Sequence, residues 1–201
     1  MIEGGAAVKQ TKLVKKAIAG NTRAFEMLFQ KHSDQLYRTA YIYVGNKEDA
    51  LDIVQETAYK AFLSMAQLRN PEYFLTWVTK ILIHQAYALL DKKKKIMLMD
   101  RPLRGLGQAE EMSLDDRMGL LEAVQHLRIE YQTAIILFYY QDLPIHEIAE
   151  LMNAPQGTVK TYLKRAKLEL KQLLNSLNVD FGYLRNFYAI QLKPIKVQLT
   201  Q

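Results

Sequence analysis

Apolar residues recur at steps of three and four in two separate stretches of this 201-residue chain. Such spacing places apolar side chains along one face of an α-helix. In the first stretch, Phe25, Leu28 and Leu36 follow a candidate N-cap at Asn21, which predicts a core helix. Alternation typical of a strand occurs only near the end of the chain, around Pro194. The spacing therefore predicts an all-α fold.

Two further helices are expected in the first stretch. One begins after Gly45 and Asn46, buries apolar residues on one side and carries acidic residues on the other. The next follows a turn at Asn70 and Pro71 and runs into the lysine block at 92–95. We therefore expect that helix to end with a strong positive charge.

Helical spacing disappears between residues 96 and 117, where Pro and Gly interrupt the chain. That composition is typical of a tether between domains. We therefore expect two small helical domains, at 17–95 and 118–178, joined by a flexible linker at 96–117. The remaining residues, 179–201, form an extra tail whose role no motif indicates. Neither domain is large enough to bury an extensive core, so each should be only modestly stable without its partners.

The composition excludes several classes of protein. The chain has no cysteine, which excludes disulfides, thiolate metal sites and cysteine nucleophiles. No apolar run approaches the roughly 20 residues that cross a bilayer, and no export leader begins the chain, so we expect a soluble cytoplasmic protein. Lys and Arg number 27 against 21 Asp and Glu, and the resulting net charge of +6 suits a polyanionic partner.

The most informative pattern is a short helix from Pro144, a break at 153–155 and a longer helix after it. Apolar residues of the longer helix face inward, while its outer side is basic and polar. A charge run alone more often indicates a solvated surface helix, but the break before it favours a helix-turn-helix that enters the DNA major groove. Lysines there can neutralise phosphates, and early residues such as Gln156 and Thr161 can reach base edges.

These residues resemble those of a sigma factor of the extracytoplasmic-function group of the sigma-70 family, over about residues 17–177. In the last domain of that family, a segment like EIAELM precedes a Gly-Thr-Val-Lys run and an Arg-Ala pair, as found here at 147–152, 157–160 and 165–166. The first domain supplies an independent match to the family's D-x-x-D-x-x-Q-E pattern. The resemblance implies a factor that binds bacterial core RNA polymerase and directs promoter-specific transcription initiation, with a stress or envelope-response regulon.

The resemblance also implies three sets of site residues. The set that docks on core polymerase is Asp49, Asp52, Gln55 and Glu56. The set that melts and reads the downstream promoter element is Arg69, Asn70, Tyr73, Trp77, Lys80, His84 and Tyr87. The set that reads the upstream element is Gln156, Thr158, Lys160, Thr161, Lys164, Arg165 and Lys167. Aromatic rings and lysines suit the second task, because unpaired bases stack on rings while lysine holds the backbone.

The sequence departs from the family pattern at two positions, and both affect promoter choice. His84 stands where the family commonly has Asn, and Gln132 stands where it usually has Arg, so the promoter sequence does not transfer. Members of the family are often restrained by an anti-sigma factor that is frequently membrane-anchored. We therefore expect such a partner, with no direct membrane insertion and no cofactor.

Two other classes of function fit parts of the sequence. A stand-alone helix-turn-helix repressor or activator would explain the basic second domain, but it would leave the acidic residues and the Trp77 helix without a role. A zinc hydrolase motif would begin at His146 and Glu147, but Glu150 stands where the second histidine is required. No phosphate-cradling Gly loop or nucleophilic Ser motif is present. We therefore expect no catalytic site and no metal site.

Overall fold

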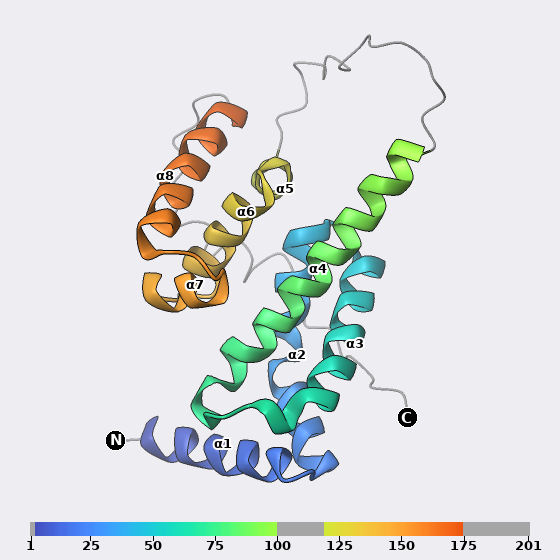
Figure 1. Ribbon diagram of the computed structural model, residues 1–201, viewed down its shortest axis with the longest axis vertical. Helices are drawn as coiled ribbons and strands as arrows, with labels where there is room; N and C mark the ends of the chain where they lie inside the picture. Colours follow the sequence, from blue (N-terminus) through green and yellow to red (C-terminus); the bar gives the residue numbers. More distant parts are fainter. Residues whose placement is uncertain (1–2, 100–118, 175–201) are drawn as a thin grey trace. The chain divides into compact units, whose positions relative to one another are not determined.

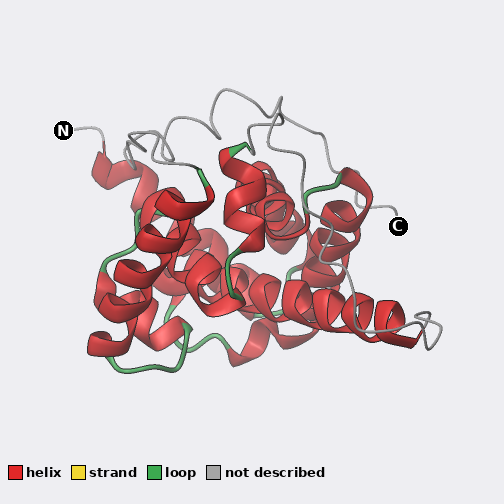
Figure 2. Ribbon diagram, turned by 90° about the horizontal axis from the view of Figure 1, so that it is seen from above, coloured by secondary structure: helices red, strands yellow, loops and turns green. Residues whose placement is uncertain are grey.

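The computed structural model describes residues 3–99 and 119–174. Every regular element among them is helical, which confirms the all-α prediction (Figure 2). These residues fall into two compact units, the first ending at Ala86 and the second beginning at Tyr87. The expected tail at 179–201, the alternating segment around Pro194 and most of the expected linker lie outside the described residues.

The first unit contains three whole helices, two short 3-10 turns and the first half of α4, up to Ala86 (Figure 1). The elements in chain order are α1 (Glu3–Ile18), α2 (Thr22–Val44), α3 (Lys47–Ser64), η1 (Met65–Gln67), η2 (Pro71–Tyr73) and α4 (Phe74–Met99), whose second half belongs to the second unit. Helix α2 packs against both α1 and α3, and α1 also contacts η1 and η2. Helix α1 mostly precedes the expected start of the first domain at residue 17, and α4 continues past its expected end at residue 95.

Asparagine caps set the helix boundaries of this unit. The Asn21 side chain accepts a hydrogen bond from the backbone N–H of Ala24 at 2.8 Å. Gly45 ends α2 with a φ of 75°, and Asn46 begins α3 by accepting from the N–H of Asp49 at 2.9 Å. Glycine adopts positive φ without the clash that a Cβ causes, and Asn caps satisfy amides that a helix start leaves open. The expected helix starts after Asn21 and Asn46 are confirmed.

The core of the first unit joins α2, α3 and α4. Leu28, Leu36, Val54, Val78 and Leu82 are each 0% exposed. Burial of a Val or Leu side chain contributes about 1.5–3 kcal/mol to folding, so these residues stabilise the unit. It also fixes which sides of α3 and α4 face outward.

The second unit contains the expected helix pair. Its elements are α5 (Leu120–His126), α6 (Ile129–Ile135), the π-helical turn η3 (Ile136–Tyr140), α7 (Ile145–Leu151) and α8 (Gln156–Leu173). Both α6 and α7 pack against α8. Between α7 and α8, Asn153 has a φ of 49°, a left-handed conformation that Asn tolerates better than most residues. This residue turns the chain, and Pro155 then precedes α8 as its N-cap.

Candidate functional site

The four residues of the D-x-x-D-x-x-Q-E pattern differ in exposure and in hydrogen bonding on α3. Asp52, Gln55 and Glu56 are exposed on the side opposite the core residues of the helix. Asp49 is only half exposed, and its carboxylate accepts a hydrogen bond from the side-chain amide of Asn46. The side chain of Asn46 also accepts a hydrogen bond from the backbone N–H of Asp49. The two residues are therefore bonded to each other twice, and the Asp49 carboxylate holds the cap residue in place. That carboxylate also lies near the positive end of the helix dipole.

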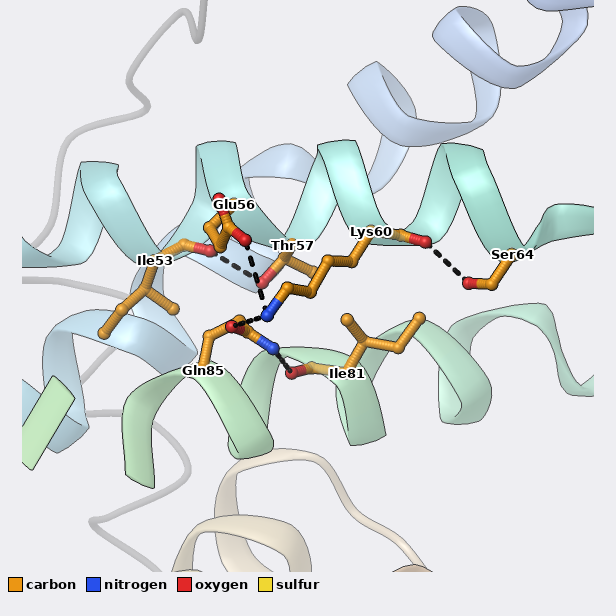
Figure 3. Close-up of polar contacts among 7 residues, drawn as sticks. All are labelled: Ile53, Glu56, Thr57, Lys60, Ser64, Ile81 and Gln85. Atoms are coloured by element: carbon orange, nitrogen blue, oxygen red, sulfur yellow. Dashed lines mark hydrogen bonds and ion pairs between the residues drawn. The ribbon is translucent and has the colours of Figure 1, made fainter. Parts of the chain in front are cut away.

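Glu56 belongs to a polar chain that links α3 to α4 (Figure 3). Its carboxylate lies 3.4 Å from the ammonium of Lys60, which donates a hydrogen bond to Oε1 of Gln85 at 2.7 Å. The amide of Gln85 donates to the carbonyl oxygen of Ile81 at 3.4 Å. About half of the surface of each ionic partner is exposed, so the pair adds little stability. Its effect is to fix the direction of the Glu56 side chain.

The outer side of α3 continues beyond the acidic residues as an apolar surface. Tyr59 is 60% exposed and Leu63 is 63% exposed, and both continue the steps of three and four that join Asp52 to Glu56. Phe62, which the spacing places on the buried side, is 43% exposed, and its ring centroid lies 5.4 Å from that of Phe25. We call Asp52, Gln55, Glu56, Tyr59 and Leu63 the α3 docking surface. Acidic and apolar side chains together suit a protein partner, because carboxylates repel phosphates.

The residues assigned to the downstream element follow one face of α4 and the turn before it. Tyr73 is 51% exposed and His84 is exposed, whereas Lys80 and Tyr87 have intermediate exposure. Steps of seven, four and three separate these residues, which places them on one side of a helix. The side therefore presents the Tyr73 ring together with Lys80 and His84, whereas the Tyr87 hydroxyl is hydrogen-bonded to the hydroxyl of Thr133 on α6 at 2.6 Å.

The remaining downstream residues have partly structural roles. Asn70 caps η2, because its side chain accepts from the backbone N–H of Glu72 at 3.3 Å. Their neighbour Phe74, which is not one of the predicted site residues, is 1% exposed and belongs to the core. Trp77 is half-buried, with its ring centroid 6.2 Å from that of Phe74. Arg69 is exposed in the turn before η2.

Helix α8 separates a buried side from a basic side. Val159, Leu163, Ala166 and Leu170 are buried. The exposed residues of the predicted upstream set are Gln156, Lys160, Thr161, Lys164, Arg165 and Lys167, and Thr158 is half-buried. No acidic residue lies in the first turn of the helix. The exposed side is therefore positive from Lys160 to Lys167, which suits a phosphate backbone.

Three members of this set have contacts that sequence spacing does not reveal. Nη1 of Arg165 donates to the hydroxyl of Tyr131 at 3.4 Å, and the Lys167 ammonium lies 5.5 Å from the ring centroid of Tyr139. The Thr161 hydroxyl donates to the carbonyl oxygen of Gly157 at 2.9 Å. Thr161 is exposed, and a threonine methyl group can contact the methyl group of thymine.

Metal and membrane chemistry receive no support from the described part of the chain. Residues 3–99 and 119–174 contain no group of His, Cys, Asp and Glu side chains that could hold a metal ion. His146, the start of the rejected zinc pattern, is exposed. Within the same ranges, no helix is long and apolar enough to cross a membrane.

Family models match both halves of the chain. Residues 28–96 match the model described as sigma-70 region 2, and residues 117–170 match the one described as sigma-70, region 4. The α3 docking surface and the outer face of α4 fall in the first match, and most of α8 falls in the second. Helix α1 precedes both matches.

Two curated relatives from Bacillus subtilis (strain 168) are similar over most of the chain. The RNA polymerase sigma factor SigV is 43% identical over 136 residues, which are 67% of this chain and 81% of that protein. The ECF RNA polymerase sigma factor SigW is 28% identical over 184 residues, covering 84% of this chain and 97% of that protein.

Two solved structures share the fold. CnrH, in complex with the cytosolic domain of CnrY, superposes with a TM-score of 0.63 and 20% identity, over 83% of this chain and 97% of that one. The sigma factor RpoE in complex with the anti-sigma factor NepR, from Bartonella quintana, gives a TM-score of 0.57 and 23% identity, over 73% of this chain and 91% of that one.

Proposed function

Because the chain belongs to the extracytoplasmic-function group of the sigma-70 family of RNA polymerase sigma factors, we propose a specific division of tasks among its helices. As a member of that family, it binds core RNA polymerase and directs transcription initiation at promoters. The proposal assigns polymerase docking and the downstream element to a first domain at 17–95. It assigns the upstream element to a second domain at 118–178, with a linker at 96–117 between them.

Docking on polymerase is assigned to the α3 docking surface. Asp52, Gln55 and Glu56 offer acceptors to basic groups of the partner, and Tyr59 and Leu63 offer apolar area beside them. Charged groups at the edge of an interface set specificity and association rate, while buried aromatic and aliphatic anchors supply most of the affinity. Asp49 contributes indirectly, because it caps the helix that carries the surface.

The downstream element is assigned to the outer face of α4 and the turn before it. Exposed Tyr73 offers a ring on which an unpaired base can stack, and Lys80 and His84 lie on the same side. A stacked base contributes about 1–3 kcal/mol, which offsets much of the cost of taking a base out of the duplex. Arg69 supplies a cation in the turn where such a base would leave the strand.

The upstream element is assigned to α8. The observation that carries this assignment is the positive outer side of α8, with Lys160, Lys164 and Lys167 exposed above a fully buried inner side. A tether between the domains raises the effective concentration of each at its own element, so two weak contacts reinforce each other. We expect either domain alone to bind promoter DNA poorly.

The partners of related structures support a further part of the proposal. RpoE and CnrH are each solved in complex with a second protein, which for RpoE is an anti-sigma factor. We propose that an anti-sigma factor, of the kind that in this family is frequently anchored in the membrane, restrains this chain in the cytoplasm and releases it to a stress or envelope-response regulon. We assign it no catalytic activity of its own, because sigma factors leave RNA synthesis to the polymerase.

Transcript mapping tests this function directly. Purified protein is mixed with bacterial core RNA polymerase and sheared genomic DNA from its source, and the 5′ ends of the transcripts are sequenced. Defined starts that require the protein and share two upstream elements at fixed spacing are the expected result. Retention of particular duplex fragments by the protein alone, without starts, would instead indicate a stand-alone regulator. Variants of Lys160 and Tyr73 then assign each helix to its element.

A further inference from the structure

His32 is a half-buried titratable residue that has no part in the tasks assigned above. It lies on α2, and its ring contacts two other helices of the first unit. Its Nε2 lies 3.4 Å from Nε2 of Gln10 on α1. Its ring centroid lies 6.0 Å from that of Phe74, the first residue of α4. His32 therefore lies where α1, α2 and α4 meet.

The side chains of Lys31 and Gln10 determine which protonation state of His32 fits this junction. The ammonium of Lys31 donates a hydrogen bond to Oε1 of Gln10. Because an ammonium cannot accept, this bond orients the amide with its oxygen toward Lys31 and its NH₂ group toward His32. Nε2 of His32 then accepts from Gln10, so the ring that fits is neutral and carries its proton on Nδ1.

A second proton on the ring would oppose the contact between α1 and α2. It would set an N–H of the imidazolium against the NH₂ group of Gln10, which is a donor against a donor. The charge that acts on the ring is the positive charge of Lys31 on its own helix. The groups that face it from α1 and α4 are Gln10 and Phe74, which carry no charge. Among the described residues, the contacts of the ring therefore include no carboxylate that would compensate the proton.

The same junction supports the turn that carries residues assigned to the downstream element. Helix α1 contacts both η1 and η2, which lie between α3 and α4 (Figure 1). Tyr73 is part of η2, and the next residue, Phe74, is 1% exposed and contacts His32. A change at His32 therefore reaches this turn by two routes, through α1 and through the start of α4.

We propose that His32 is a proton-sensitive switch whose protonation releases α1 from α2 and loosens the turn at 69–73, so that promoter melting falls in mild acid. Above about pH 7 the ring is neutral and the junction is closed. As the pH falls through the usual histidine value of 6.5, the released state binds the proton more readily than the closed one and becomes favoured. This inference rests on the proposed assignment of the turn to the downstream element.

The yield of melted promoter as a function of pH tests the switch. Holoenzyme containing the full chain is mixed with a promoter found by transcript mapping, at several values between pH 5.5 and 7.5. Permanganate reactivity of unpaired thymines measures melting. H32F keeps an aromatic contact with Phe74 but cannot take up the proton. We expect melting by the wild type, as a ratio to H32F, to fall about threefold to tenfold between pH 7.5 and 5.5.

The variant Q10E tests the hydrogen-bond geometry itself. A carboxylate at this position still accepts from Lys31, and it also accepts from an imidazolium, so it should stabilise the protonated ring. Melting by Q10E should therefore stay constant or rise as the pH falls to 5.5. Q30E is the matched control, because Gln30 is exposed on α2 and a residue two positions from His32 does not face it. Q30E should keep the acid loss of the wild type.

Several results would overturn the inference while leaving the proposed function intact. An equally steep loss in H32F would place the acid sensitivity in the polymerase or in another group. Equal rescue by Q10E and Q30E would show a general effect of charge. Loss of the whole helical signal of the wild type in circular dichroism at pH 5.5 would show unfolding in place of a local release. Absence of any start with the wild type at pH 7.5 would instead refute the proposed function.

Discussion

The guanidinium of Arg165 donates a hydrogen bond to the hydroxyl of Tyr131 at 3.4 Å, from the exposed side of α8 to the buried side of α6. Tyr131 is 4% exposed, and its ring centroid lies 5.6 Å from that of Tyr162 on α8. The ring is therefore fixed by the core, and its hydroxyl orients the arginine. An arginine held in one direction loses less conformational entropy when it binds a phosphate.

Replacement of Arg165 and Tyr131 should separate these two roles. We expect R165Q to reduce the salt slope of promoter binding by about one, because it removes one phosphate contact. Y131F should weaken binding less, and the double variant should resemble R165Q, because the hydroxyl acts through the arginine. Fluorescence anisotropy of holoenzyme on a mapped promoter measures all three. An unchanged salt slope in R165Q would make the contact purely structural.

Replacement of Gly157 should stabilise the protein and weaken promoter binding. A Cβ at this position meets no atom within 4 Å, so the fold does not require glycine there. Alanine should raise the free energy of unfolding by about 0.5–1 kcal/mol, because glycine has the greater conformational freedom in the unfolded chain. The first turn of α8 is where a DNA backbone would approach, and the added methyl group would obstruct it. Urea unfolding and promoter binding of G157A, with Q172A as a control on the same helix, measure both effects.

Local signals in the sequence were sufficient for helix starts but not for every helix. Asn21 and Asn46 stand before apolar runs and cap α2 and α3 as expected. Helix α1 was not predicted, although Leu13, Val14, Ala17 and Ile18 have helical spacing. Val14 and Ala17 are buried, and the helix packs against α2. Nε2 of Gln10 on α1 lies 3.4 Å from Nε2 of His32 on α2, and these two residues are distant in sequence.

Tertiary contacts also determine the exposure and the hydrogen bonds of site residues that helical spacing alone does not predict. The D-x-x-D-x-x-Q-E pattern does not distinguish Asp49, which caps α3, from Asp52, which is exposed. Helical spacing places Arg165 outward, and its exposure agrees, but its bond to Tyr131 depends on how α6 packs against α8. Phe62 lies at the border of the buried side, where a small rotation of α3 determines its exposure. These features depend on residues that are remote in the chain.

Polar replacement of Tyr59 and Leu63 should weaken binding to core polymerase without unfolding the protein. Both side chains are at least 60% exposed, so Y59Q and L63Q remove little buried area. If they anchor the α3 docking surface, each should cost about 1–2 kcal/mol of binding, roughly tenfold in affinity. Surface plasmon resonance with core enzyme measures this loss. L168Q is the matched control, because Leu168 is 55% exposed on α8 and lies outside that surface. Equal losses in all three variants would contradict the assignment.

The stability of the first unit should fall in mild acid because of His32. Burial, and then the charge of Lys31, hold the pKa of His32 below its usual value of 6.5. The unfolded chain therefore binds the proton more readily than the folded one, and stability rises with pH around the unfolded pKa. The contribution is complete above about pH 7 and is lost as the pH falls through 6.5 toward the lower folded value.

Replacement of His32 by an aromatic residue without a titratable group should remove this dependence. The His32 ring centroid lies 6.0 Å from that of Phe74, so H32F keeps an aromatic contact between α2 and α4. Urea unfolding between pH 5 and 7.5 should show a smaller loss of stability in acid for H32F than for the wild type. H84F is the matched control, because it replaces a histidine that is exposed on the outer face of α4. If H32F keeps the wild-type pH dependence, groups other than His32 cause it.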